Sequence, residues 1–539
     1  MDALYRGRFA TLDDARPTAT VIAVLGGRIV AIDDETEGLQ AATKEDFGTR
    51  AVFPGFHDAH AHTPSFGLSL GQLDLSTPPV NILDDLYTLV ANRAASQERA
   101  TWVIGSGYDQ NKLGGSHPSR RRLDEAAAGR PVWLQHTSGH MCVVNSAVLD
   151  LIGPRLRDPI AGGVVQLDDG GEPTGLLEER AQALVQSLVL PRSLEQLASA
   201  IGRAHERYLA EGITSVCDAG IAGGWVGQSP VELAAFQLAR ETGRLQVRTT
   251  VMISSEVIHE TGSHAGDGIE RALDAGIRTG LGDEWLRVGP LKVFSDGSLI
   301  GRTCWMHEAF SDQPGNSGYP QADPAELRRT IVDAHRAGWQ VATHAIGDAA
   351  VGFVLDCYAE ALEVAPRSDT RHRIEHCAIT TDEALGRIAA LGVIPVPQGR
   401  FIGEIGDGML AALGPERGLL AYRMKGFLEA GVALPGSSDR PVVDGRPLLG
   451  IADMVMRRTE SGRPFGPGEA LTPEEALVAY CAGSAYATRT EHERGTLSVG
   501  KLADFVVLEA DPRRVAPEAI GDIAVAATVV GGEIAYPAV

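Results

Sequence analysis

The sequence predicts an α/β fold in which strands of a parallel sheet alternate with helices, with a smaller sheet added from the two ends of the chain. Three observations lead to this prediction. Short apolar runs alternate with longer helical stretches through the middle of the chain, β-rich runs stand at both ends, and 539 residues are enough for a large core. Alternation on this scale indicates a parallel sheet, either open or closed into a barrel.

Both ends of the chain are rich in residues that favour strands. The runs are 21–25, 28–32, 505–508 and 526–530. Two glycines separate the first two runs, which predicts a hairpin. Because an isolated hairpin is only marginally stable in water, we expect residues 1–52 and 491–539 to complete one small β domain together.

Residues 53–490 are expected to form the parallel sheet and its helices. Apolar strand-like runs occur at 132–134, 214–217, 291–294, 340–343 and 393–396, and helical runs occur at 194–211 and 324–337. Asp323 is suited to cap the second of these helices. The span exceeds the roughly 250 residues of a typical (β/α)₈ barrel, so a barrel would need an insertion. The span of about 64–185, rich in glycine and proline turns, is predicted to be an insertion that caps the barrel mouth.

Charge and cysteine usage limit the choice of partners and compartment. The net charge of -22 disfavours binding to nucleic acid or to an anionic membrane. The sequence contains no signal-peptide pattern and no apolar run long enough to cross a bilayer. Its six cysteines are scattered without close spacings, which favours free thiols. We therefore expect a cytoplasmic protein that acts on a small molecule, and a homodimer would fit the commonest oligomeric symmetry.

The stretch 53–62, with the sequence FPGFHDAHAH, contains the first candidate metal ligands. In a strand, side chains two residues apart point to the same face, so His60 and His62 would project together. Imidazole suits zinc, iron or nickel, and a metal that activates water keeps one coordination position open. An isolated His-x-His also occurs at ordinary strand ends, so the remaining ligands must come from later in the chain.

Further metal-capable residues stand at the ends of later apolar runs. His344 follows 340–343, His376 follows 372–375, and Asp439 follows 432–438. Each alone is compatible with a turn or a buried structural residue. Their joint placement at strand ends, where a barrel carries its chemistry, predicts one site with His60 and His62.

Lys292 lies inside the apolar run 289–294, where an unpaired ammonium would be costly to desolvate. Only five of the 48 basic residues are lysine, so an amine here is informative. A lysine amine can add CO2 to form a carbamate, which is a carboxylate-like ligand able to bridge two metals. The alternative is a lysine that pairs with Asp296 or extends its amine to the barrel end.

With these residues in place, the sequence resembles the amidohydrolase superfamily and, more narrowly, the amidohydrolase 3, YtcJ-like family, which includes N-substituted formamide deformylases. The order His-x-His, Lys, His, His, Asp is similar to the ligand order on strands one, four, five, six and eight of that barrel. The narrower resemblance rests on motifs along nearly the whole chain: 54–58 (PGFHD), 105–109 (GSGYD), 117–120 (HPSR), 292–299 (KVFSDGSL) and 500–504 (GKLAD). The chain has Ile300 to Cys304 (IGRTC) where the family often has GSRTA, which bears on substrate contacts near Cys304.

The resemblance implies a (β/α)₈ TIM barrel with a small β-sandwich built from both termini, and a site for one or two divalent metal ions, with zinc expected. It assigns one metal to His60, His62 and Asp439 and a second to His344 and His376. A carbamate on Lys292 would bridge the two. Asp439 would act as the catalytic general base and then as the general acid. Two further residues are candidates for substrate binding. His140 is expected to bind substrate or the oxyanion, with a loop or helix-capping histidine as the alternative, and Asp296 is expected to contact substrate or to position Lys292.

The implied activity is hydrolysis of an amide, formamide or N-acyl C–N bond by metal-activated water. An ester or lactone hydrolase would use the same site. A deaminase is disfavoured, because residues 345–348 (AIGD) replace the glutamate that such enzymes tend to carry after the strand-five histidine. A barrel that had lost its metal could serve as a binding or assembly protein, but all the ligand positions are filled.

Overall fold

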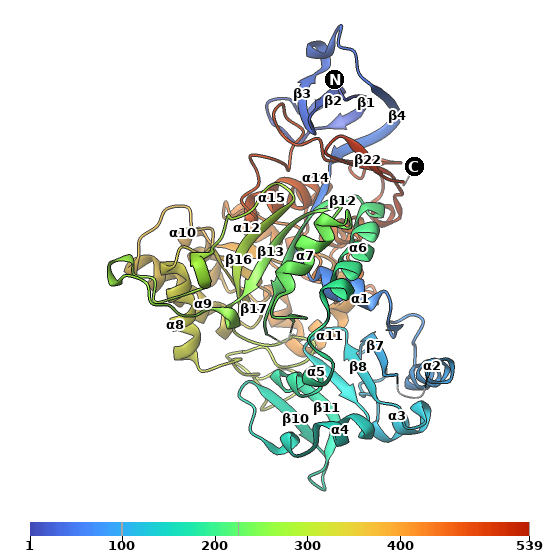
Figure 1. The fold of residues 1–539 in the computed structure, drawn as a ribbon, viewed down its shortest axis with the longest axis vertical. Coiled ribbons are helices and arrows are strands. Elements are labelled where there is room, and N and C mark those ends of the chain that lie inside the picture. The colour runs from blue at the N-terminus through green and yellow to red at the C-terminus, as the bar shows by residue number, and fades with distance from the viewer. Residues whose placement is uncertain (99–100, 225, 538–539) are drawn as a thin grey trace.

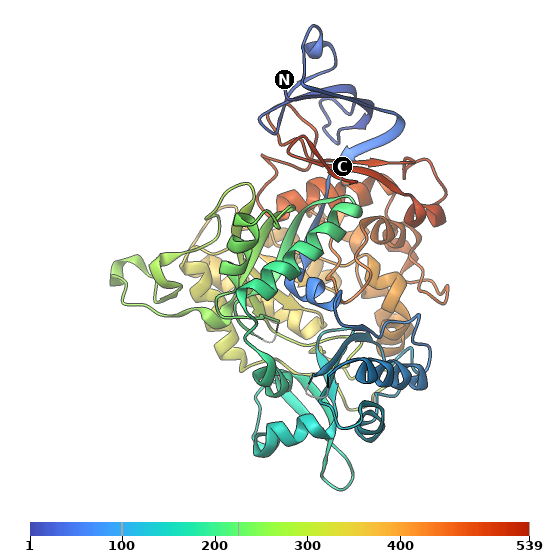
Figure 2. The same cartoon turned by 45° about the vertical axis from the view of Figure 1, so that its right-hand side comes forward.

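The computed structural model describes residues 1–98, 101–224 and 226–537. Its parts are arranged along the long axis of the molecule (Figures 1 and 2). A sheet from both termini lies at one end, a parallel barrel lies in the middle, and the insertion lies at the opposite end. Within these described ranges, no helix has the length and apolar composition needed to cross a bilayer.

The middle part is a nearly closed parallel barrel. Among the described residues, its sheet contains seven strands, in the order β19-β18-β17-β16-β13-β12-β5, and each neighbouring pair is parallel. The strands are β5 (Phe56–Ala61), β12 (Ile213–Ile221), β13 (Arg248–Ser254), β16 (Leu286–Phe294), β17 (Val341–Ala345), β18 (Arg373–His376) and β19 (Ile394–Val396). Four of the predicted apolar runs, from 214–217 to 393–396, lie in this sheet. A fully buried parallel strand reads as a continuous apolar run, which is why these were recognisable.

Helices cover the outside of the barrel. They are α1 (Thr63–Ser69), α6 (Leu194–Ala210), α7 (Glu232–Glu241), α8 (Pro324–Arg336), α9 (Asp348–Val364), α10 (Asp382–Leu391), α11 (Arg400–Arg417), α12 (Met424–Glu429), α13 (Pro447–Met456), α14 (Pro473–Val478) and α15 (Ser484–Ala487). The Ser193 hydroxyl caps α6, and the Asp323 carboxylate accepts the Ala325 N–H at the start of α8. Both predicted helices therefore begin at the expected residues.

The predicted eighth strand, before Asp439, is not a regular strand among the described residues. The segment still lies beside β5, because the Ala59 and Asp439 N–H groups bond to the Gly436 and His60 carbonyls at 3.0 and 2.7 Å. Pro435 has no N–H to give to a ladder, and the Gly436 N–H donates to Ala479 instead of to a neighbouring strand. The segment thus adjoins the barrel without regular pairing on both sides.

Both termini contribute to one sheet, in the order β22-β21-β20-β4-β1-β2-β3. The strands are β1 (Ala3–Ala10), β2 (Thr18–Leu25), β3 (Arg28–Ile32), β4 (Thr43–Pro54), β20 (Phe505–Leu508), β21 (Val525–Val530) and β22 (Glu533–Tyr536). Tyr5 and Phe9 meet Phe505 edge to face, with ring centroids 5.1 and 5.9 Å apart. The predicted hairpin is present as β2 and β3, which pair antiparallel. A sandwich of two sheets is not confirmed, since the strands form a single sheet.

The insertion has a sheet of its own, in the order β10-β11-β9-β8-β7-β6. Its elements are β6 (Leu73–Asp74), α2 (Leu83–Ser96), β7 (Val103–Tyr108), α3 (Arg120–Ala127), β8 (Val132–His136), β9 (Met141–Val144), α4 (Ser146–Ile152), β10 (Gly163–Leu167), β11 (Pro173–Glu179) and α5 (Ala183–Val189). The apolar run 132–134 lies in this sheet rather than in the barrel. The exact division of the chain into domains stays a prediction. A short hairpin, β14 (His259–Glu260) with β15 (Arg271–Ala272), precedes β16.

A buried ion pair joins the barrel to the terminal sheet. Arg248 of β13 donates from Nε and Nη2 to the two carboxylate oxygens of Asp504, at 2.7 and 3.1 Å, and both side chains are buried. Replacing Asp504 with Asn leaves a buried guanidinium without its full counter-charge. We expect the free energy of unfolding to fall by about 3–5 kcal/mol. Chemical denaturation measures this change.

The matched control for this prediction is Glu509→Gln. Glu509 forms an exposed pair with Arg50 at 2.8 Å in the same part of the molecule. An exposed pair contributes about 0–1 kcal/mol, so this variant is expected to unfold nearly as the unmodified protein does. Equal losses in the two variants would show that burial does not set the strength of the Arg248 pair.

Candidate metal centre

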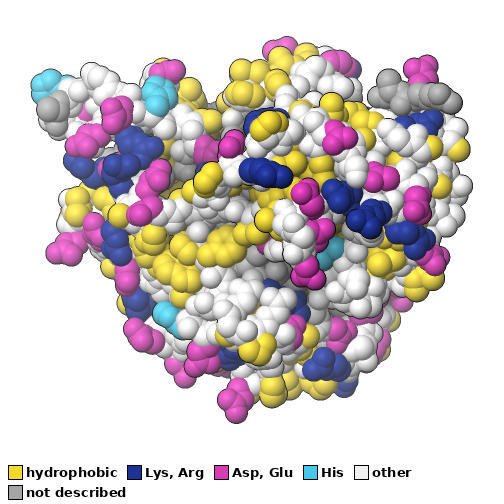
Figure 3. Space-filling view, turned by 90° about the horizontal axis from the view of Figure 1, so that it is seen from below, with side chains coloured by type: hydrophobic (Ala, Val, Ile, Leu, Met, Phe, Trp, Pro, Cys, Tyr) yellow, Lys and Arg dark blue, Asp and Glu magenta, His cyan; other side chains and the backbone are white. Residues whose placement is uncertain are grey.

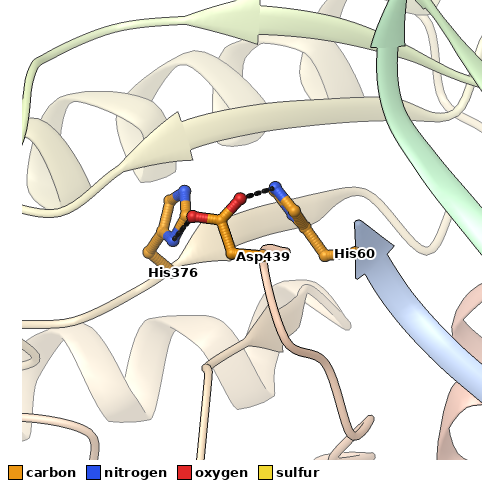
Figure 4. A group of neighbouring side chains, drawn as sticks. All are labelled: His60, His376 and Asp439. Atoms are coloured by element: carbon orange, nitrogen blue, oxygen red, sulfur yellow. Dashed lines mark ion pairs between the residues drawn. The ribbon is translucent and has the colours of Figure 1, made fainter. Parts of the chain in front are cut away.

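Three of the predicted ligands converge from distant parts of the chain. Figure 4 shows His60 at the end of β5, His376 at the end of β18, and Asp439 between them. The Asp439 Oδ1 atom lies 3.2 Å from His60 Nε2 and 3.2 Å from His62 Nε2, and its Oδ2 atom lies 4.0 Å from His376 Nδ1. All of these side chains except His62 are almost completely buried. Alternation along β5 thus brings His60 and His62 to one carboxylate, as the spacing predicted.

The donor set fits a divalent metal. His60, His376 and Asp439 each offer a ligand atom, and these atoms lie within 4.8 Å of one another. Among the described residues, the buried His60 Nε2 atom has no hydrogen-bond partner of acceptable geometry, although a carboxylate oxygen faces it. A buried nitrogen in this state is costly unless something binds it. Two imidazoles and a carboxylate are also ligands that zinc and similar metals accept.

Lys292 and His344 extend this group along the barrel. The sheet register places Lys292 of β16 beside Ala342 and Phe294 beside His344. The His344 ring centroid lies 4.5 Å from that of His376. The Lys292 ammonium is buried, 4.8 Å from the centre of the Phe294 ring. Burial lowers the pKa of Lys292 to about 8, although Glu375 and Asp439 oppose that shift. A lowered pKa increases the fraction of neutral amine, which is the form that adds CO2.

Two buried side chains contact the predicted histidine ligands and orient their rings. The His60 Nδ1 atom contacts a carboxylate oxygen of Glu375, and Arg373 holds both oxygens of Glu375 at 2.7 and 2.8 Å. Burial acts to raise the pKa of Glu375, but Arg373 and His60 hold it well below its usual range. An ionised Glu375 accepts the His60 Nδ1 proton and leaves Nε2 directed at the site. On the other ligand, His376 Nδ1 lies 2.8 Å from Gln398 Oε1.

Glu375 and Arg373 were not among the predicted site residues. The signal was present in the run 373–376 (RIEH), where Arg373 and Glu375 alternate with an apolar residue in a strand whose four residues are all buried. Charged side chains on the inner face of a barrel strand require partners. Only the fold could show that one of those partners is His60.

Asp296 does not form the ion pair with Lys292 that was the alternative to a carbamate. Among the described residues, its ion pair is with His344, whose Nε2 lies 3.4 Å from Oδ1. Its carboxylate also accepts the N–H groups of Trp305 and Gly347 at 3.0 and 2.9 Å. Burial raises the pKa of Asp296 to about 7, while these N–H groups act to lower it. Its role as a substrate contact stays a prediction.

His140 reaches the site from the insertion. Its ring centroid lies 5.2 Å from that of His344, and its Nδ1 atom lies 2.8 Å from Glu179 Oε2. The side chain is nearly buried but lines the central cavity. The insertion therefore contributes a histidine beside the predicted metal ligands. Substrate binding by His140 stays a prediction.

A cavity of about 860 Å³ opens at this end of the barrel. Its wall combines the six predicted metal ligands with polar residues of the insertion, such as Gln135 and Gln182. Several of the charged side chains around it pair with one another, as Lys112 does with Glu460 at 2.6 Å and Arg440 with Glu211 at 2.6 Å. On the face of the molecule at the insertion end, acidic and basic side chains are interspersed (Figure 3). The volume suits a small molecule.

Several sequence relatives match most of the length of this chain. The protein LONG AFTER FAR-RED 3 of Arabidopsis thaliana is 30% identical, and the match covers 98% of this chain and 91% of the relative. YtcJ of Bacillus subtilis (strain 168), provisionally named an amidohydrolase, is 30% identical over 90% of this chain and 89% of its own. The N-substituted formamide deformylase of Arthrobacter pascens is 29% identical over 98% of this chain and 96% of its own.

Solved structures share the fold. An uncharacterized metal-dependent hydrolase of Pyrococcus horikoshii OT3 superposes with a TM-score of 0.74 and is 25% identical, covering 96% of this chain and 99% of its own. The sequence model of the amidohydrolase family matches residues 46–536, a span that includes every predicted metal ligand. The chain therefore belongs to the amidohydrolase family.

Proposed function

We propose that this protein is a metal-dependent hydrolase that cleaves the C–N bond of a small amide, with formamides and N-acyl compounds as its substrates. The observation that carries the proposal is the convergence of His60, His376 and Asp439 in a buried site, where their ligand atoms lie within 4.8 Å of one another. The named deformylase among the relatives supports the substrate class. The paired charges around the cavity suit a polar substrate without net charge.

The six predicted ligands are divided between two metal ions in this proposal. We assign His60, His62 and Asp439 to one divalent ion, which we propose is zinc, and His344 and His376 to a second, with a carbamate on Lys292 between them. A metal held there supplies Lewis acidity, which lowers the pKa of water towards neutrality and polarises a carbonyl. Glu375 and Gln398 keep the His60 and His376 rings in place.

Asp439 is the proton carrier in this proposal. Burial acts to raise the pKa of Asp439, but His60 and His62 hold it well below its usual range, so the carboxylate is ionised. It accepts a proton from the attacking water and returns that proton to the leaving nitrogen. Water thus adds to the carbonyl carbon, the C–N bond breaks, and a carboxylic acid and an amine are released.

A chromogenic panel tests the substrate class. We expect 4-nitroformanilide and 4-nitroacetanilide to release 4-nitroaniline, to stop doing so after treatment with a chelator, and to recover when zinc is added. Hydrolysis of 4-nitrophenyl acetate without any anilide cleavage would favour an ester hydrolase. Ammonia release from aminopurines would favour a deaminase. Absence of metal after reconstitution would favour a binding protein.

Intact mass measured under non-denaturing conditions in bicarbonate tests the proposed carbamate. We expect a CO2 adduct and two metal ions per chain in the unmodified protein, because Lys292 is a buried amine with a lowered pKa. The Lys292→Ala variant should lose the adduct and part of the metal. The matched control is Lys425→Ala, which removes a lysine that pairs with Glu475 at 2.5 Å on the barrel exterior and should keep both. One metal without an adduct would contradict the bridged site.

A further inference from the structure

Glu179, at the end of β11, is a completely buried carboxylate outside the predicted ligand set. Its Oε2 atom accepts from His140 Nδ1 at 2.8 Å and from Gln321 Nε2 at 2.9 Å, and its Oε1 atom accepts from Thr303 Oγ1 at 2.5 Å. His140 belongs to the insertion, whereas Thr303 and Gln321 lie between β16 and α8 of the barrel. The side chain therefore joins the insertion to the barrel next to the site.

The backbone at Glu179 adopts an uncommon conformation. Its φ and ψ are 51° and −127°, a backbone conformation that residues other than glycine rarely adopt. The Glu179 N–H donates to the His140 carbonyl at 2.7 Å. Such a conformation costs about 1–3 kcal/mol and persists only where the surroundings enforce it. Here it turns the carboxylate towards His140 while the backbone of the same residue is tied to His140. Glu179 is thus bonded to His140 through both its side chain and its backbone.

This contact determines how the His140 ring is presented. A carboxylate only accepts hydrogen bonds, so His140 Nδ1 carries the proton of the contact. The backbone of His140 is held as well, because its N–H donates to Ser138 Oγ at 3.1 Å. With Nδ1 directed at Glu179, the opposite edge of the ring faces away from Glu179. The ring itself lies 5.2 Å from His344 and lines the cavity.

We propose that Glu179 is a positioning residue that holds His140 against the metal end of the cavity, so that the insertion supplies a substrate contact to the barrel site. This inference rests on the proposed hydrolase function. A positioning role for Glu179 can be distinguished from a role that only holds the insertion to the barrel. If Glu179 acts through His140, its removal matters only while His140 is present.

A double-mutant cycle with 4-nitroformanilide measures that dependence. We expect kcat/KM to fall about 10–100-fold in Glu179→Gln, the range found when the partner that orients a functional histidine is lost. His140→Ala should fall at least as far. In the His140→Ala background, the added Glu179→Gln change should alter kcat/KM less than twofold. Full metal content is expected in all three variants.

Glu178→Gln is the matched control. Glu178 is the neighbouring carboxylate, and it bonds to Gln166 on the far strand of the insertion sheet at 3.0 Å. Its variant should keep the activity of the unmodified protein. Additive losses in the cycle, or full activity in His140→Ala alone, would overturn the proposal. The second of these tests applies even if Glu179→Gln does not fold.

Crystal structures separate this proposal from the proposed function. In the Glu179→Gln protein we expect the His140 ring to have turned away from its contact with His344, whether or not any substrate of the panel is cleaved. An unmoved ring would overturn the positioning role even if activity were lost. A moved ring in a protein that cleaves none of the panel would keep the positioning role and reject the hydrolase proposal.

Discussion

Asp439→Asn should lose nearly all C–N bond hydrolysis. The change keeps the shape of the side chain but removes the charge that faces His60 and His62 at 3.2 Å. An amide cannot take up the water proton, and loss of the proposed general acid and base is expected to cost about 10²–10⁴-fold in rate. Weaker metal binding would add to that loss. The measurement is kcat/KM with 4-nitroformanilide, alongside metal content per chain.

Activity and metal content together distinguish a role of Asp439 in proton transfer from a role in metal binding. Loss of activity with full metal would identify proton transfer as its main contribution, whereas loss of metal would identify it chiefly as a ligand. Activity retained with full metal would contradict both roles. Asp382→Asn is the control, because Asp382 is an exposed carboxylate that pairs with Arg423 at 2.6 Å on a barrel helix. That variant should match the unmodified protein.

Glu375→Gln is expected to lower both the stability of the protein and its affinity for metal. Arg373 is completely buried, and its side chain donates to both oxygens of Glu375 and to the Ala59 carbonyl at 2.8 Å. Neutralising Glu375 leaves the guanidinium without a counter-charge in the barrel interior. We expect the free energy of unfolding to fall by about 3–5 kcal/mol. Because His60 loses its acceptor, metal affinity should also fall about 10–100-fold.

Denaturation of the metal-free protein separates these two effects, since bound metal would itself stabilise the native state. The companion variant is Arg373→Met with Glu375→Gln. Removing both charges of a buried pair is often close to neutral, so the double variant should recover much of the lost stability while metal affinity stays weakened. If the double variant is less stable than Glu375→Gln alone, the unpaired guanidinium is not the cause of the loss.

Strand geometry made the grouping of these side chains predictable. Alternation fixes the direction of His60 and His62, and parallel strands of a barrel bring their carboxyl ends to one edge, so His344 and His376 could be expected beside them. Asp439 was predicted for the same reason, although the segment before it is not a regular strand. The alternation of side-chain direction along a strand repeats every two residues, so it can be read directly from the sequence.

The supporting contacts were not predictable in this way. Glu375 contacts His60 across 315 residues of sequence, and Glu179 contacts both His140 and Thr303 through a backbone conformation that no local pattern indicates. Asp296 has neighbours from two loops instead of the lysine four residues before it. Such contacts depend on how separate elements pack, which is why only the folded chain reveals them.

The direct passage of β4 into β5 has a consequence for synthesis of the protein. Only Gly55 separates the last residue of β4 from the first residue of the strand that carries His60. One edge of β4 pairs with β1, but the other pairs with β20, which begins at Phe505 near the end of the chain. A nascent chain therefore carries an open strand edge until β20 has been synthesised, and such edges promote aggregation. A C-terminal truncation before β20 would make that exposure permanent.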